Sequence, residues 1–130
     1  MIGYNYRMPA LNASLGCAQM EKLPEFLKKK RLLAGRYAEA FADARGVRFF
    51  IEPAFAKSNY WLNTIILGKE LADQRDDVLR VTNGNGIMTR PAWMLMPTLP
   101  MFKDSPRMNL ACAEDLVKRI INIPSSADLV

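Results

Sequence analysis

The sequence predicts an α+β domain in which a small, mainly antiparallel sheet is covered by helices. Two observations predict this class: the first third of the chain has helical periodicity, and two runs rich in β-branched and aromatic residues, Val47–Ile51 and Asn59–Leu67, follow close together. The predicted order is helix, helix, strand, strand, helix, strand, loop, helix, which lacks the strict alternation of a parallel α/β sheet. No repeat or linker interrupts the chain, so we expect residues 1–130 to form one domain.

The first third of the chain predicts two helical stretches. Pro9 suits the first position of a helix, and Pro24 should interrupt or kink that helix and restart it through Arg45, with Gly46 as the stop. The first stretch carries a stripe of small residues that would let another element approach closely; its members are Ala10, Ala13, Ser14, Cys17 and Ala18. An uncovered stripe of this kind favours self-association, so we expect a homo-oligomer, most simply a dimer.

The middle of the chain predicts a short strand, a more central strand and a helix. The run Val47–Ile51 is the short strand and Asn59–Leu67 the central one. Asp73 is a plausible N-cap for a helix that continues to Arg80 or Val81. The sequence NGNG (Asn83–Gly86) could be a phosphate cradle, but it follows a helix instead of opening one, which favours a helix end and a turn.

The last third predicts one more strand, a long loop and a final helix. The strand is expected over Ile87–Arg90, and Pro91 should end it. Residues Pro91–Pro106 are rich in Pro and Met without a clear period, and this predicts an ordered loop over a surface. Residues Asn109–Ile121 have the pattern of a last helix.

The composition excludes several classes of function. The chain has no histidine, which excludes Ser-His and Cys-His nucleophile pairs and ordinary metal sites that use histidine. Cys17 and Cys112 lie far apart in apolar surroundings, and buried free thiols are favoured over a disulfide or a reactive site. No apolar run is long enough for a bilayer and no secretory signal opens the chain, so we expect no membrane partner and a cytoplasmic protein.

The net charge of +5 and the pI near 9.4 favour an anionic partner. The densest cationic run is KKKR (Lys28–Arg31), for which a solvated helix surface is favoured over a phosphate-binding patch. One alternative function is therefore a non-catalytic binding or assembly module with a basic surface for an acidic partner. Nucleic acid is disfavoured as that partner, because no basic cluster is interleaved with aromatic residues.

Five blocks carry a resemblance to a known family. They are GYNYRMPALNASLGCAQMEKL (Gly3–Leu23), SNYWLNTIIL (Ser58–Leu67), NGNGIMTRPAW (Asn83–Trp93), LPMFKD (Leu99–Asp104) and INIPSS (Ile121–Ser126). In this order they resemble the C-terminal part of the DegT/StrS-type sugar-nucleotide aminotransferases, which depend on pyridoxal phosphate. Within that family they are similar to the perosamine synthetases and to the aminotransferases of bacillosamine and legionaminic acid synthesis. The resemblance implies the small C-terminal domain of a fold-type-I aminotransferase.

The resemblance implies roles for three residues. Asn5 matches the asparagine that reaches across the family's dimer to the cofactor phosphate of the other subunit. Arg7 lies beside Asn5 and Arg90 matches the arginine of the family's TRP block, so both are candidates for holding the anionic nucleotide sugar, since a guanidinium offers a fixed fork for a diphosphate. The alternatives remain a loop-capping asparagine for Asn5 and ordinary salt bridges for the two arginines. Three aromatic residues of these blocks are favoured as packing residues over substrate contacts: Tyr4, Tyr6 and Trp93.

The family's catalytic lysine lies in a segment that this sequence does not contain. None of the chain's lysines stands in a comparable context, and no acidic residue matches the partner of the pyridinium nitrogen. We therefore expect that the cofactor-binding large domain is absent, that no residue of this chain is catalytic, and that the isolated chain binds no pyridoxal phosphate and does not transaminate. A second departure is Pro97, where relatives often have a histidine.

Overall fold

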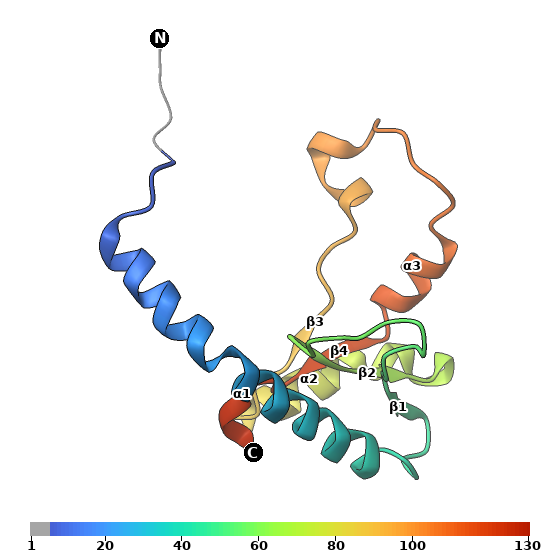
Figure 1. Cartoon of the computed structure of the whole chain (residues 1–130). Helices are drawn as coiled ribbons and strands as arrows, with labels where there is room; N and C mark the ends of the chain where they lie inside the picture. The colour runs from blue at the N-terminus through green and yellow to red at the C-terminus, as the bar shows by residue number, and fades with distance from the viewer. Residues whose placement is uncertain (1–5) are drawn as a thin grey trace.

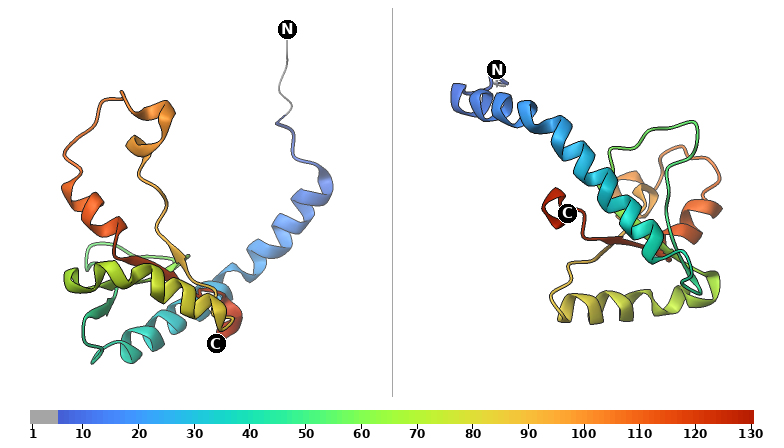
Figure 2. Two further views of the ribbon diagram at one scale, coloured as in Figure 1. Left: turned by 180° about the vertical axis from the view of Figure 1, so that it is seen from behind. Right: turned by 60° about the horizontal axis from the view of Figure 1, so that its bottom comes forward.

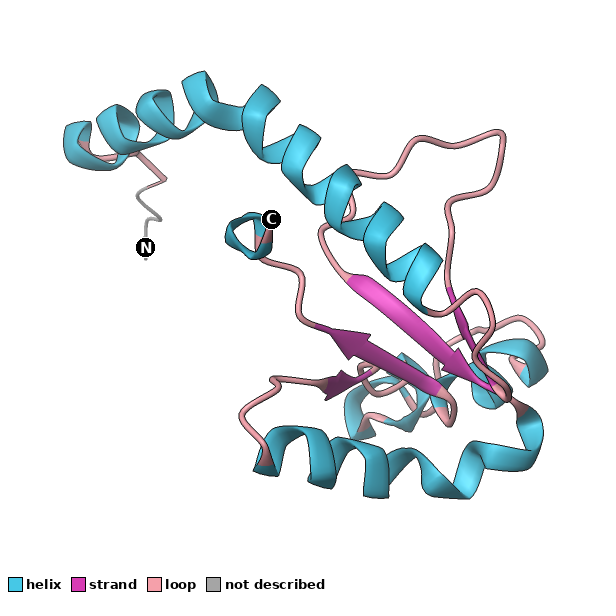
Figure 3. Ribbon diagram, turned by 90° about the horizontal axis from the view of Figure 1, so that it is seen from below, coloured by secondary structure: helices cyan, strands magenta, loops and turns pink. Residues whose placement is uncertain are grey.

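The computed structural model describes residues 6–130, and its first element is one long helix, α1 (Ala10–Ala40). Of the two outcomes expected at Pro24, the interruption is wrong and the kink agrees with the structure, because Pro24 lies inside α1. A proline there removes only its own hydrogen bond to the carbonyl of Met20, a residue exposed to solvent. Figure 3 shows α1 bending midway along its length, as expected for a helix with an internal proline.

Four strands form a fully antiparallel sheet in the order β1-β2-β4-β3. Their bounds are β1 Val47–Phe49, β2 Asn63–Leu67, β3 Arg90–Pro91 and β4 Ile120–Ile123. The other helices are α2 (Arg75–Gly84) and α3 (Ala111–Val117), and a 3-10 helix, Lys69–Gln74, leads into α2. The α+β class and the antiparallel sheet predicted from the sequence are confirmed.

The hydrophobic core lies between one face of the sheet and two helices. The strands contribute Phe49, Ile65 and Ile121 to this face, and Ala34 of α1 packs against them. Side chains of α2 pack against the same cluster, so α1 and α2 cover one face of the sheet (Figure 3). The alternate residues of each strand point to the opposite face, as the two-residue period of a strand requires.

The boundaries of β2 and α3 differ from the prediction. The strand β2 begins at Asn63 instead of Asn59, because Tyr60 has a φ of 47°, which no strand residue adopts. The side chains of Ser58 and Asn59 accept backbone hydrogen bonds two residues ahead, from Tyr60 and Trp61, and so form local turns. The predicted last helix is too long: α3 ends at Val117, and Ile120–Ile123 is strand β4.

Two segments extend away from the sheet on the same side of the molecule (Figures 1 and 2). One is the N-terminal half of α1, and the other is the chain from residue 92 to residue 110, which contains two short 3-10 turns. The predicted loop is thus ordered but projects instead of lying over a surface. Cys17, in the first segment, and Cys112 are free thiols as expected, but both are exposed, so the prediction of burial is wrong.

Candidate functional site

Arg90 is the sequence-predicted site residue that the structure places in a regular element. It lies on the edge strand β3, where it is paired with Asn122 of β4. Within residues 6–130, no hydrogen bond or ion pair engages the Arg90 guanidinium, which is exposed. Arg90 is therefore available to an anion, and its position is set by the backbone of the sheet.

The turn before β3 contributes to the placement of Arg90. The side chain of Asn83 donates to the carbonyl oxygen of Thr89 at 3.0 Å and accepts from the Thr89 backbone N–H at 3.2 Å. The hydroxyl groups of Thr82 and Thr89 lie 2.6 Å apart, and Gly86 supplies a φ of 77°. The interpretation of NGNG as a helix end and turn is confirmed, because α2 ends at Gly84 and these contacts occupy Asn83.

The face of the sheet opposite α1 and α2 carries a groove of about 360 Å³. Strand register places Thr64, Asn122 and Arg90 in one row across this face. The Thr64 hydroxyl donates to the Asn122 side-chain oxygen at 2.9 Å, and the Asn122 amide donates to the carbonyl of Pro91 at 3.3 Å. Thr64 and Asn122 line the groove and Arg90 does not; the other lining residues are apolar: Phe50, Leu62, Ile66, Ala92, Trp93, Leu116 and Ile120.

The two tryptophans of the chain stack against each other beside this groove. The ring centroids of Trp61 and Trp93 are 5.9 Å apart, with an interplanar angle of 26°. The residues are 63% and 71% exposed, so each ring keeps a large free surface. Trp93 does pack, as expected, but on another exposed ring and not in the core. Trp61 was not anticipated as part of the site.

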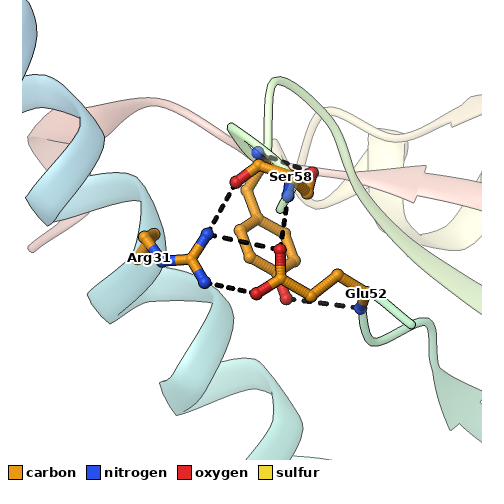
Figure 4. Close-up of polar contacts among 4 residues, drawn as sticks. Arg31, Glu52 and Ser58 are labelled. Carbon is orange, nitrogen blue, oxygen red and sulfur yellow. Dashed lines mark hydrogen bonds and ion pairs between the residues drawn. The ribbon is translucent and has the colours of Figure 1, made fainter. Parts of the chain in front are cut away.

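The KKKR run is only partly a solvated helix surface: Lys28 is exposed, whereas Lys30 and Arg31 bind other parts of the chain. The Lys30 ammonium donates to the carbonyl of Ser125 at 2.6 Å and to those of Tyr60 and Trp61 at 3.4 Å each. Arg31 binds Glu52 with both terminal nitrogens and also donates to the carbonyl of Ser58 at 2.7 Å (Figure 4). Half of this cationic run therefore cross-links the fold.

The Arg31–Glu52 contact perturbs both groups. The hydrogen bond from Arg31, together with the backbone N–H of Ser58, holds the pKa of the Glu52 carboxyl below its ordinary value. The hydrogen bond to Glu52 in turn raises the pKa of Arg31. No local pattern in the sequence predicts this pair, because the two residues are 21 positions apart.

The other sequence-predicted site residues are Asn5 and Arg7. Asn5 lies outside the described residues. Arg7 is exposed and precedes α1, whose N-terminal half leads away from the sheet (Figure 1). The structure therefore does not bring Arg7 and Arg90 together within this chain, and the roles of Asn5, Arg7 and Arg90 stay predictions.

The lysines among residues 6–130 are hydrogen-bonded, ion-paired or exposed. A lysine that anchors pyridoxal phosphate needs a free amine in an enclosed pocket. Lys30 lines a groove beside α1, but its ammonium is bound to three carbonyl oxygens. Lys29 is paired with Glu25, and the remaining lysines are exposed: Lys22, Lys28, Lys57, Lys69, Lys103 and Lys118. No cluster of metal-binding side chains occurs between residues 6 and 130.

Comparison with known proteins assigns the whole chain to one family. The model of the DegT/DnrJ/EryC1/StrS aminotransferase family matches residues 1–130. The chain is 38% identical to the putative pyridoxal phosphate-dependent aminotransferase EpsN of Bacillus subtilis, over 98% of the chain and 34% of the relative. It is 32% identical to the GDP-perosamine synthase of Vibrio cholerae, over 96% of the chain and 34% of the relative. The chain thus spans about a third of the length of these relatives.

Solved structures show the same fold. Helicobacter pylori PseC, an aminotransferase involved in the biosynthesis of pseudoaminic acid, superposes with a TM-score of 0.89 at 22% identity, over 100% of this chain and 35% of that one. The sugar aminotransferase CalS13 of Micromonospora echinospora superposes with a TM-score of 0.83 at 19% identity, over 98% of this chain and 33% of that one. The fold and the family match agree over the full length, and the chain belongs to the DegT/DnrJ/EryC1/StrS aminotransferase family.

Proposed function

We propose that this chain is the small C-terminal domain of a sugar-nucleotide aminotransferase, working with a cofactor-binding domain that it does not itself contain. The complete enzyme would transfer an amino group, with glutamate as donor, to the keto carbon of a nucleotide-linked sugar for surface polysaccharide synthesis. The observation that carries this proposal is the match of residues 1–130 to about a third of each relative. In isolation, the chain would be inactive.

Pyridoxal phosphate, held by the other domain, would act as the electron sink of the transfer. The residues of this chain would complete the pocket and hold the substrate. Arg90 would bind the diphosphate, because its guanidinium is uncommitted and its backbone is fixed in the sheet. Arg7 would assist, and Asn5 would donate to the cofactor phosphate of a neighbouring subunit.

A fusion protein tests this proposal. The chain would replace the matching third of the Vibrio cholerae GDP-perosamine synthase, and the fusion would be assayed for its cofactor absorption band and for formation of GDP-perosamine. We expect activity in the fusion and none in either part. Arg90→Gln should raise the KM about tenfold, since hydrogen bonds to charged groups are strong. Arg45→Gln, an exposed arginine after α1, is the matched control. A folded, cofactor-loaded fusion without turnover would contradict the proposal.

Self-association and a cytoplasmic setting are part of the same proposal. The N-terminal half of α1 exposes Leu11, Leu15 and Met20 beside the small-residue stripe, and a second subunit or the cofactor domain would cover this surface. Light scattering at high concentration should give at least a dimeric mass, and a strictly monomeric mass would count against a homo-oligomer.

Two exposed free thiols support a reducing compartment. No helix within residues 6–130 is long and apolar enough to cross a membrane.

The alternative of a basic binding module receives less support. Its densest cationic run is largely committed, because Lys30 and Arg31 bind groups of the same chain. Such a module would bind an acidic partner with an affinity that falls steeply as salt is added.

A further inference from the structure

We propose that Arg31 and Glu52 are a positioning pair that sets the Trp61–Trp93 stack and, through it, the segment that carries Arg90. The role of this segment in substrate binding rests on the proposed function. The series of contacts from Arg31 to Trp93 does not rest on it, because every contact lies within this polypeptide.

The first link joins α1 to the chain that follows β1. Arg31 binds both carboxylate oxygens of Glu52, and the same carboxylate accepts a hydrogen bond from the backbone N–H of Ser58 (Figure 4). Arg31 also donates to the carbonyl of Ser58 at 2.7 Å. Both polar groups of the Ser58 backbone are thereby tied to one ion pair, and the bidentate geometry fixes direction as well as distance.

The second link holds the next residues in a conformation that they would not adopt alone. Tyr60 has a φ of 47°, a left-handed conformation that costs a bulky residue energy unless its surroundings impose it. The Arg31 guanidinium lies 5.5 Å from the centroid of the Tyr60 ring, and the Tyr60 hydroxyl accepts from the backbone N–H of Glu52 at 3.4 Å. Lys30 binds the carbonyl oxygens of Tyr60 and Trp61 from the same turn of α1.

The third link carries this geometry to the far edge of the sheet. Trp61 directly follows Tyr60 and stacks on Trp93, three residues after Arg90. Strands β2 and β3 are not neighbours, since β4 lies between them, so the indole stack joins segments that the sheet keeps apart. Losing the ion pair should therefore release Tyr60, shift Trp61 and free Trp93.

The two tryptophans make the proposal measurable, because the chain contains no others. Stacked indoles couple electronically and give a paired signal in far-ultraviolet circular dichroism, which is lost when the rings separate. The test measures this signal in the 130-residue chain and in Arg31→Met and Glu52→Gln variants, with Trp61→Phe defining its absence. Lys29→Met is the matched control, since it breaks an exposed ion pair with Glu25 on the same helix.

We expect Arg31→Met to lose most of the paired signal while keeping its helical spectrum and cooperative unfolding. Glu52→Gln should lose part of it, because the amide oxygen can still accept from Ser58. The double variant should be no worse than Arg31→Met alone, as for two members of one interaction. Should Arg31→Met not fold, Glu52→Gln decides the outcome. A folded Arg31→Met or Glu52→Gln chain with an undiminished signal overturns the proposal.

A second measurement uses the fusion protein. Arg31→Met there should raise the KM for the nucleotide sugar about tenfold with little change in kcat, because misplacement of a binding group weakens substrate capture. If the KM is unchanged although the indole signal is lost, the inference that the tryptophan stack positions Arg90 is overturned. An inactive unmodified fusion counts against the proposed function alone, and the indole signal still decides the contact chain.

Discussion

Replacement of Ile121 by alanine should destabilise the fold strongly. Ile121 lies on β4, is 0% exposed and belongs to the core cluster. The substitution removes about three carbon atoms, worth about 2.4 kcal/mol of transfer free energy at about 0.8 kcal/mol each. The cavity left between sheet and helices adds to this loss, so the free energy of unfolding should fall by about 3–4 kcal/mol.

The assay is urea unfolding followed by far-ultraviolet circular dichroism, with the slope of the transition checked for constancy. Ile120→Ala is the matched control, because Ile120 is half-buried and faces the opposite side of the sheet. Its cost should stay below about 1.5 kcal/mol. A larger loss at position 120 than at position 121 would refute the assignment of the two faces of the sheet.

Three further changes test the remaining features. Asn63→Val should raise the free energy of unfolding by about 1–2 kcal/mol in the same assay, because the buried amide finds no partner among residues 6–130; a loss would contradict this. Gly86→Ala should cost about 1–2 kcal/mol because its φ is 77°, whereas Gly84→Ala, in open space within α2, should not destabilise; equal effects would disprove the turn geometry. The Glu52 pKa is lowered by Arg31, so its stabilising contribution is full above the ordinary value of 4.5 and is lost as the pH falls below it. The stability difference between the native chain and Glu52→Gln should therefore shrink on acidification, and a difference independent of pH would exclude the ion pair.

The class of the fold could be predicted because its strongest signals are local. The apolar spacing that predicts α1 and the β-branched runs that predict β1 and β2 act within a few residues. Strand β4 could not be predicted because IINI follows α3 after only Lys118 and Arg119, and a short apolar run after a helix has no period that separates helix from strand. Its identity as a strand depends on pairing with β2 and β3, which are distant in sequence.

The candidate site was predictable only at the level of single residues. The family resemblance pointed to Arg90, and the structure adds the turn through Asn83 that places it. The roles of Lys30 and Arg31 could not be predicted, because their partners lie 21 to 95 positions away. A run of four cations looks the same in the sequence whether its members face water or tie distant segments together.

The length and continuity of α1 have a mechanical consequence. Its 31 residues span about 46 Å, at about 1.5 Å per residue, and only the C-terminal part is embedded in the core. A domain or subunit bound to the N-terminal end of α1 would be connected to the sheet by a rigid helix and not by a flexible linker. Movement of that end would be transmitted along α1 to its embedded C-terminal part, and the hydrogen bond missing at Pro24 is a place where the helix could bend instead.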